Sequence, residues 1–176
     1  PMFDLAYTGG FAVGAFNVNN MEITQGIIDA CAAEKAPLIL QISKGARKYA
    51  NMTYLRHIIL AAVEEHPELP IAIHLDHGDT VDLVNQCLAD GFTSVMIDGS
   101  HHDYAGNVKV SADVVKVAHA AGVVVEAELG QLGGIEEDVV GLDPEEYQKN
   151  LHKFVTDPVQ AADFWKQTGV DSLAVA

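Results

Sequence analysis

A short group of ionisable residues follows an apolar segment near the middle of the chain. The segment reads IAIHLDHGDT at positions 71–80 and contains His74, Asp76 and His77. Burying such groups is costly unless they have partners or a chemical task. A histidine beside a carboxylate at a strand tip suits a metal ligand next to a general acid or base. A structural hydrogen-bonded pair explains the same stretch equally well.

Carboxylates also stand at the ends of the next two apolar segments. Asp98 ends the segment in VMIDGSHH, and Glu128 ends the one in VEAELG. Three consecutive predicted strands each end with an imidazole or a carboxylate at the same rim. Such a pattern is hard to explain if these residues are only solvated surface side chains. The spacing therefore favours a metal-binding or acid–base site. His101 and His102 follow Asp98 closely and could reach such a site, although a solvated loop fits them better.

A glycine-rich segment with acidic residues at its tip follows Glu128. It reads GQLGGIEEDVVG at positions 130–141. A flexible surface loop is one interpretation. The other is a lid that carries a carboxylate, Glu136 or Glu137, over a bound substrate. The pattern by itself supports the two interpretations equally.

Short apolar segments alternate with segments of helical periodicity along the chain. The predicted strands are residues 11–18, 36–43, 70–76, 93–98, 122–130 and 171–176. The predicted helices are residues 21–34, 53–66, 80–91, 111–122 and 157–169. Ser111 and either Thr156 or Asp157 are the predicted N-caps of the last two helices. Such alternation with nearly continuous apolar strands predicts a parallel sheet covered by helices.

Both a doubly wound sheet and a (β/α)₈ TIM barrel fit this alternation. The polar residues at strand ends favour the barrel, because the active site of a barrel is assembled at the carboxyl ends of its strands. These residues are Asn17, Ser43, Asp76, Asp98 and Glu128. A doubly wound sheet predicts a glycine-rich turn after the first strand, and FNVNNME contains no such turn.

The length of 176 residues suits a single domain with one core. We therefore expect residues 1–176 to form one (β/α) barrel domain of the α/β class. About six strands are recognisable, whereas a parallel barrel closes with eight. We accordingly expect the chain to be truncated at its C-terminus, before the last two strands.

The composition disfavours several classes of function. The formal net charge of -15 argues against a nucleic-acid partner, which requires a basic surface. No apolar segment reaches the about 18 residues of a membrane helix. The two cysteines, Cys31 and Cys87, lie in predicted helices and are expected to be buried, reduced thiols. Together these features predict a cytoplasmic protein.

Taken together, the motifs resemble the class II, zinc-dependent ketose-bisphosphate aldolase family. The motifs are GAFNVNNME, LQISKGA, IHLDHGD, SVMIDGSH, VEAELGQLGG and GVDSLAVA, and they run in order over essentially the whole chain. The resemblance implies a lyase that cleaves fructose 1,6-bisphosphate into dihydroxyacetone phosphate and glyceraldehyde 3-phosphate in glycolysis, and runs in reverse in gluconeogenesis. It leaves tagatose 1,6-bisphosphate as an alternative substrate.

The resemblance also implies a role for each site residue. His77 matches a ligand of the catalytic zinc, and Asp98 and Glu128 match the carboxylates of a second metal position. Asp76 matches the acid–base residue for the C4 hydroxyl of the substrate. Glu136 matches the loop glutamate that moves a proton on the dihydroxyacetone phosphate carbon. Asn17 and Ser43 match polar residues that line the substrate channel.

The family carries two further zinc histidines, and this chain stops before them. We therefore expect the isolated chain to be inactive and the longer parent to be the enzyme, in a homodimer or a larger homo-oligomer. Two alternatives stay open at this point. One is a metal-dependent sugar-phosphate epimerase built on the same barrel. The other, from a different class, is an inactive fragment or a half-barrel that depends on a partner to cover its sheet edges.

Overall fold

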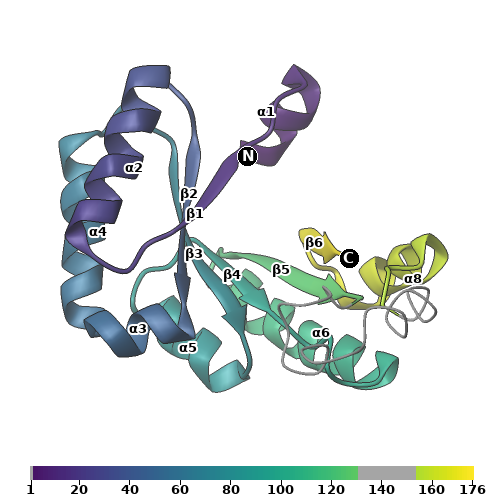
Figure 1. Cartoon of the computed structure of the whole chain (residues 1–176). Helices are drawn as coiled ribbons and strands as arrows, with labels where there is room; N and C mark the ends of the chain where they lie inside the picture. Colours follow the sequence, from purple (N-terminus) through teal and green to yellow (C-terminus); the bar gives the residue numbers. More distant parts are fainter. Residues whose placement is uncertain (1, 131–153) are drawn as a thin grey trace, which may run out of the picture. The chain divides into compact units, whose positions relative to one another are not determined.

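Helices and strands alternate along the chain in the computed structural model, which describes residues 2–130 and 154–176 (Figure 1). The chain divides into two units. The first comprises Pro1–Asp76 and Ala89–Ser94, and the second comprises His77–Leu88 and Val95–Ala176. Among the described residues, no helix combines the length and the apolar character needed to cross a membrane.

Three parallel strands form the sheet of the first unit in the order β1-β2-β3. Their bounds are Gly14–Asn17 for β1, Leu38–Ser43 for β2 and Ile71–Gly78 for β3, whose last two residues belong to the second unit. In β2 every second residue is buried, beginning at Leu38, so the alternate residues lie on the opposite face. The register pairs Asn17 with Gln41, and Ser43 with Asp76. The polar residues of the three strands are therefore gathered at their carboxyl ends.

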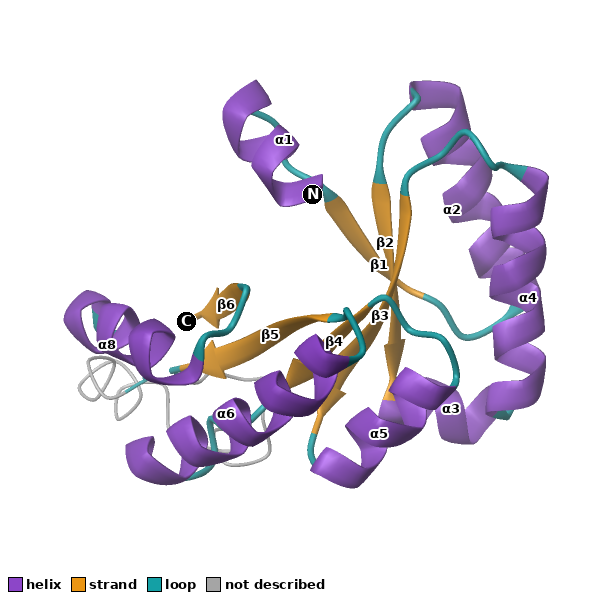
Figure 2. Cartoon of the chain, turned by 180° about the vertical axis from the view of Figure 1, so that it is seen from behind, coloured by secondary structure: helices purple, strands orange, loops and turns teal. Residues whose placement is uncertain are grey.

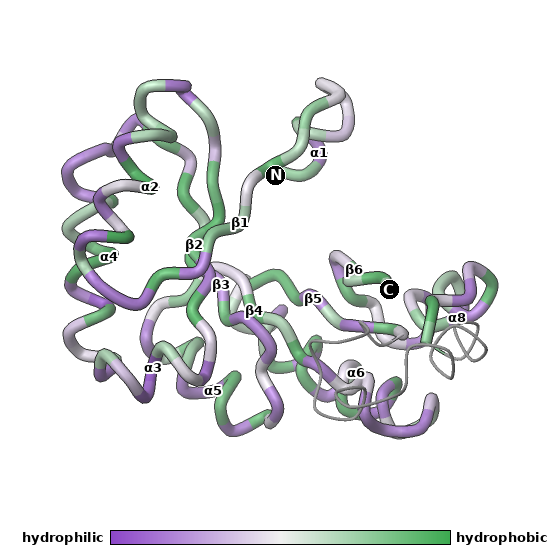
Figure 3. The backbone as a smooth tube through the Cα atoms, viewed as in Figure 1, coloured by the Kyte–Doolittle hydropathy of each residue, from purple (hydrophilic) through white to green (hydrophobic). Residues whose placement is uncertain are grey.

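The helices of the first unit are α1 (Met2–Gly9), α2 (Met21–Glu34), α3 (Lys44–Ala50) and α4 (Met52–Glu65). The two long helices, α2 and α4, pack with one apolar face inward. In α2 and α4, which lie side by side in Figures 1 and 2, hydrophobic and hydrophilic residues alternate (Figure 3). Ile28 of α2 and Ile59 of α4 are almost fully buried. Each helix thus contributes an apolar stripe to the core.

The second unit also has parallel strands with helices packed against them, and its strand order is β4-β5-β6. Its elements are α5 (Val81–Ala89, whose last residue belongs to the first unit), β4 (Ser94–Ile97), α6 (Tyr104–Ala120), β5 (Val124–Leu129), α8 (Pro158–Thr168) and β6 (Ser172–Val175). Helix α6 packs against β5 and α8 (Figure 2). Asp157 caps α8 by accepting a hydrogen bond from the Gln160 backbone, and Gly169 ends it with a left-handed φ of 73°.

All six predicted strands are confirmed, and the main correction concerns α6. The sequence predicts that this helix starts after Ser111, but it begins at Tyr104 and its N-cap is Asp103. Ser111 instead lies buried inside the helix. The short helices α1 and α3 were not predicted. The expectation of a single domain stays a prediction.

Phe164 offers a test of the packing in the second unit. Its side chain is fully buried, and its ring meets the Tyr104 ring edge-on at 6.1 Å between centroids. We expect Phe164→Ala to lower the free energy of unfolding by about 3–5 kcal/mol, the usual cost of truncating a buried aromatic residue. Chemical denaturation of the purified protein measures this change. The neighbouring Trp165, 58% exposed on the same helix, is the control, and an equal loss in Trp165→Ala would contradict the described packing.

Candidate functional site

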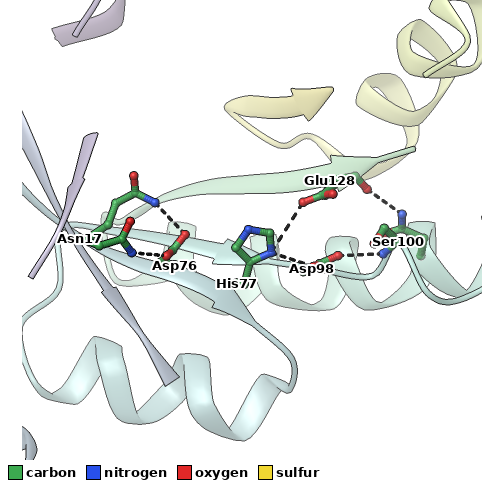
Figure 4. A network of polar contacts seen from close by, with 8 residues as sticks. Asn17, Asp76, His77, Asp98, Ser100 and Glu128 are labelled. Atoms are coloured by element: carbon green, nitrogen blue, oxygen red, sulfur yellow. Dashed lines mark hydrogen bonds and ion pairs between the residues drawn. The ribbon is translucent and has the colours of Figure 1, made fainter. Parts of the chain in front are cut away.

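The carboxyl group of Asp76 is held by two amide side chains of the first unit. Asn17, the last residue of β1, donates a hydrogen bond of 2.6 Å to Oδ2 (Figure 4). Gln41 of β2 donates one of 2.6 Å to Oδ1. Each oxygen of the carboxylate thus has its own donor, one from the adjacent strand β2 and one from β1, the next strand beyond it. This arrangement fixes the plane of the carboxylate at the carboxyl end of β3, where an acid–base residue requires a defined orientation.

Gln41 is a residue of this group that the sequence interpretation missed. It lies in the middle of β2, between the buried Leu40 and Ile42, and the register places it opposite His74. The signal was nevertheless present. An amide within an otherwise apolar strand, two positions before Ser43, shares a strand face with that serine.

Ser43 has a structural role as the N-cap of α3. Its Oγ accepts a hydrogen bond of 3.1 Å from the Ala46 backbone. Because a serine hydroxyl can accept while it donates its own proton, the cap is compatible with a contact to substrate. Ser43 is also the partner of Asp76 in the strand register. The substrate-binding role given to Ser43 stays a prediction.

In the second unit, His77, Asp98 and Glu128 converge on one point (Figure 4). The Nδ1 atom of His77 lies 2.8 Å from Oδ2 of Asp98 and 3.7 Å from Oε2 of Glu128. One ligand atom from each residue lies within 4.8 Å of the others. The structure therefore brings together the three residues that the sequence predicts as metal ligands.

The backbone at His77 adopts an uncommon conformation. Its φ is 47°, in the left-handed region that residues other than glycine adopt only with a conformational cost. The next residue, Gly78, accepts a hydrogen bond of 2.8 Å from the Asp98 backbone. That bond anchors the end of β3 beside the end of β4. The imidazole of His77, the last residue but one of β3, thereby reaches Asp98.

Asp98 is held in its ionised form. Burial by itself raises the pKa of this carboxyl, but hydrogen bonds from His77 and from Ser100 outweigh it and lower the pKa to about 2. The Ser100 backbone donates a hydrogen bond of 3.0 Å to Oδ1. At neutral pH the group is therefore a carboxylate, the form in which it can bind a cation.

Glu128 is almost completely buried, at 1% exposure, near the end of β5. Its main-chain oxygen accepts a hydrogen bond of 2.8 Å from the Asn107 side chain. An imidazole nitrogen with two carboxylate oxygens is a donor set that suits Zn²⁺ and related divalent cations. The three side chains of the second unit consequently fit a metal, and the half-exposed His77 leaves the group open to a ligand from solvent.

Other ionisable residues singled out in the sequence do not belong to this group. His74 is buried, and its Nδ1 lies 2.8 Å from the Ser94 hydroxyl, which makes it a structural residue of the first unit. His101 and His102 are exposed, and their rings face each other at 4.2 Å between centroids. Glu136 and Glu137 lie outside the described residues, so the lid interpretation stays a prediction.

Sequence and structure comparisons identify the family. Over residues 1–176 the chain matches the family described as fructose-bisphosphate aldolase class-II. The chain belongs to this family. It is 54% identical over 166 residues to the fructose-bisphosphate aldolase of Giardia intestinalis, with coverage of 94% of this chain and 48% of that protein. It is 48% identical over 181 residues to the fructose-bisphosphate aldolase of Treponema pallidum, with coverage of 99% and 52%.

A solved structure supports the same fold. The chain superposes on the YdjI aldolase from Escherichia coli K12 with a TM-score of 0.84 and 30% identity, covering 99% of this chain and 60% of that one. The prediction of an α/β chain that contributes about six strands to a (β/α)₈ barrel is thereby confirmed. The class II aldolase chain described here spans about half the length of the relatives it matches. The family is in general metal-dependent, and the His77 group offers a site for a metal.

Proposed function

We propose that this chain supplies acid–base and metal-binding residues to a zinc-dependent fructose-1,6-bisphosphate aldolase. The activity belongs to a polypeptide of the relatives' length that includes these 176 residues, here termed the family-length protein. The reaction is the reversible cleavage of fructose 1,6-bisphosphate into dihydroxyacetone phosphate and glyceraldehyde 3-phosphate. The proposal rests on two residues that are adjacent in the sequence, Asp76 and His77, and on the separate partners that each one has. Asp76 is oriented by two amides, and His77 is joined to two carboxylates.

Asp76 is the proposed acid–base residue. During cleavage its carboxylate accepts the proton of the C4 hydroxyl, and during condensation it returns that proton to the aldehyde oxygen. The donors on both of its oxygens, Asn17 and Gln41, keep the carboxylate in one orientation. A fixed orientation matters because proton transfer requires the base within hydrogen-bond reach of the hydroxyl. Asn17 is exposed, and we propose that its amide also contacts the substrate.

His77, Asp98 and Glu128 are the proposed metal ligands of this chain. We assign His77 to the catalytic zinc, and Asp98 and Glu128 to a second metal position beside it. The catalytic zinc would supply Lewis-acid polarisation of the substrate carbonyl and stabilise the enediolate. Asp98 contributes an ionised carboxylate, and its hydrogen bond with His77 orients the imidazole. We retain the assignment of Glu136 to proton movement on the dihydroxyacetone phosphate carbon and of Ser43 to substrate contact.

The family assignment supports an aldolase over the sugar-phosphate epimerase. Direct comparison of substrates tests the proposal. The family-length protein, assayed by coupling triose phosphate formation to NADH oxidation, should cleave fructose 1,6-bisphosphate with a higher kcat/KM than tagatose 1,6-bisphosphate. Preference for the tagatose substrate would overturn the substrate assignment. Cleavage of neither substrate by a metal-loaded, folded protein would overturn the function. We further propose that the enzyme is cytoplasmic. We also propose that it is a homo-oligomer, and size-exclusion chromatography with light scattering tests that oligomeric state.

Metal dependence gives a second test. We expect chelation with EDTA to abolish cleavage by the family-length protein and added Zn²⁺ to restore it, because the reaction uses a metal rather than a lysine Schiff base. Lys44, the lysine nearest to these strand ends in the sequence, lies exposed at the start of α3. Borohydride should therefore trap no substrate on the protein. A covalent adduct after borohydride treatment, together with activity that chelators leave unchanged, would contradict the metal mechanism.

A further inference from the structure

Asn107 on α6 holds the strand end that carries Glu128. Its side chain is 2% exposed, and its Nδ2 donates a hydrogen bond of 2.8 Å to the Glu128 main-chain oxygen. Its Oδ1 accepts one of 3.2 Å from the Ser111 hydroxyl, one helical turn later, and Ser111 is fully buried. Because the Glu128 oxygen can only accept, it fixes which way the Asn107 amide faces, and the Ser111 hydroxyl holds the other end of the amide. The donor group is directed at Glu128 and the acceptor at the helix.

The same asparagine also lies against the strand end that carries Asp98. Gly99 directly follows Asp98, and a Cβ atom on Gly99 would collide with Oδ1 of Asn107 and lie 3.0 Å from a methyl group of Val110. The chain after Asp98 therefore approaches α6 so closely that only a glycine fits there. Asp98 and Glu128, the two proposed carboxylate ligands, therefore each lie on a stretch of chain that contacts Asn107.

We propose that Asn107, locked by Ser111, is a positioning residue that sets the spacing of the Asp98 and Glu128 carboxylates for the metal. This inference rests on the proposed function of the site. Asn107 acts through the backbone at Glu128 and through the close packing at Gly99. Groups that support metal ligands in this way affect affinity because a metal requires its donor atoms at defined distances.

The test measures metal affinity directly. In Asn107→Leu the side chain keeps a similar volume but loses both hydrogen bonds. We expect the dissociation constant for Zn²⁺, measured by competition with a chromophoric chelator on the family-length protein, to rise by about 10- to 100-fold. The Co²⁺-substituted variant should show an altered d–d absorption spectrum. Excess Zn²⁺ should recover a large share of the lost kcat, because the defect is in holding the metal.

Two further variants separate positioning from general stability. Ser111→Ala removes the partner that holds Oδ1 of Asn107, and it should shift the affinity in the same direction by a smaller factor. If Asn107→Leu does not fold, the Zn²⁺ affinity of Ser111→Ala tests the positioning role in its place. Thr168→Val is the matched control, because it removes a buried hydrogen bond of 2.8 Å to the Phe164 oxygen within the same unit. We expect it to lower the melting temperature and to leave the Zn²⁺ affinity and Co²⁺ spectrum unchanged.

The outcomes distinguish this inference from the proposed function. Wild-type affinity and spectrum in folded Asn107→Leu, or in Ser111→Ala if the first does not fold, would overturn the positioning role even if the protein cleaves its substrate normally. Conversely, reduced affinity in both variants would support the positioning role even if the wild-type protein binds metal but cleaves neither ketose bisphosphate. In that case only the assignment of the reaction fails.

Discussion

Replacing Asp76 by alanine in the family-length protein should lower the rate of fructose 1,6-bisphosphate cleavage by roughly 10²- to 10⁴-fold, the usual contribution of a general acid or base. The physical reason is the loss of the acceptor for the C4 hydroxyl proton. The zinc content should change little, since Asp76 is held by Asn17 and Gln41 and is not itself a proposed ligand. Steady-state kinetics and metal analysis of one preparation measure both quantities.

The exposed Asp82 on α5 provides the matched control for this experiment. Asp82→Ala removes an acidic side chain a few residues away and should leave kcat within a factor of about two, because surface substitutions rarely have large effects. Full turnover in Asp76→Ala would remove Asp76 from the acid–base role. Loss of zinc from that variant would instead make the residue part of the metal site.

The second large effect is expected at His77. Loss of a residue that only supports a metal ligand lowers metal affinity by up to roughly 100-fold. His77→Ala should reduce the affinity for zinc by more than that, because it removes a ligand itself. Cleavage should fall in proportion to the metal content. The substitution keeps a residue other than glycine at this position, where φ is 47°. Metal analysis after dialysis, with circular dichroism to verify folding, measures the effect.

His101 is the appropriate control for His77. It is an exposed histidine in the segment after Asp98, and its ring contacts His102 rather than the proposed metal ligands. His101→Ala should keep both zinc and activity. If His101→Ala lost its zinc while His77→Ala kept it, the assignment of the imidazole ligand would be wrong.

The strands and their terminal residues could be predicted because the pattern that marks each one lies within a few consecutive residues of the sequence. A short run of Val, Ile and Leu that ends in a polar residue predicts both a buried strand and its carboxyl end. Asp98, for example, immediately follows β4, and Glu128 lies in β5 one residue before its end. The parallel arrangement then places such residues at one edge of a sheet. The grouping of His77 with Asp98 and Glu128 follows from this rule.

The supporting residues were not predictable in the same way because their roles depend on packing. Ser111 follows VKV in a segment that also contains Gly106 and Asn107, so it resembles a helix N-cap, but α6 begins earlier, at Tyr104. Its hydroxyl bonds to Asn107 inside the helix, which only the packed structure reveals. Gln41 stands out as an amide in an apolar run, but its partner Asp76 lies on another strand, so its role follows only from the register between the strands.

Crystallographic location of zinc in the family-length protein tests the central claim most directly. Anomalous diffraction measured on both sides of the zinc absorption edge, from crystals of the metal-loaded protein, identifies the ion without relying on activity. We predict a zinc peak about 2.0–2.2 Å from a nitrogen of His77 or from carboxylate oxygens of Asp98 and Glu128. An active, fully loaded enzyme whose zinc peak lies away from all three side chains would contradict the account.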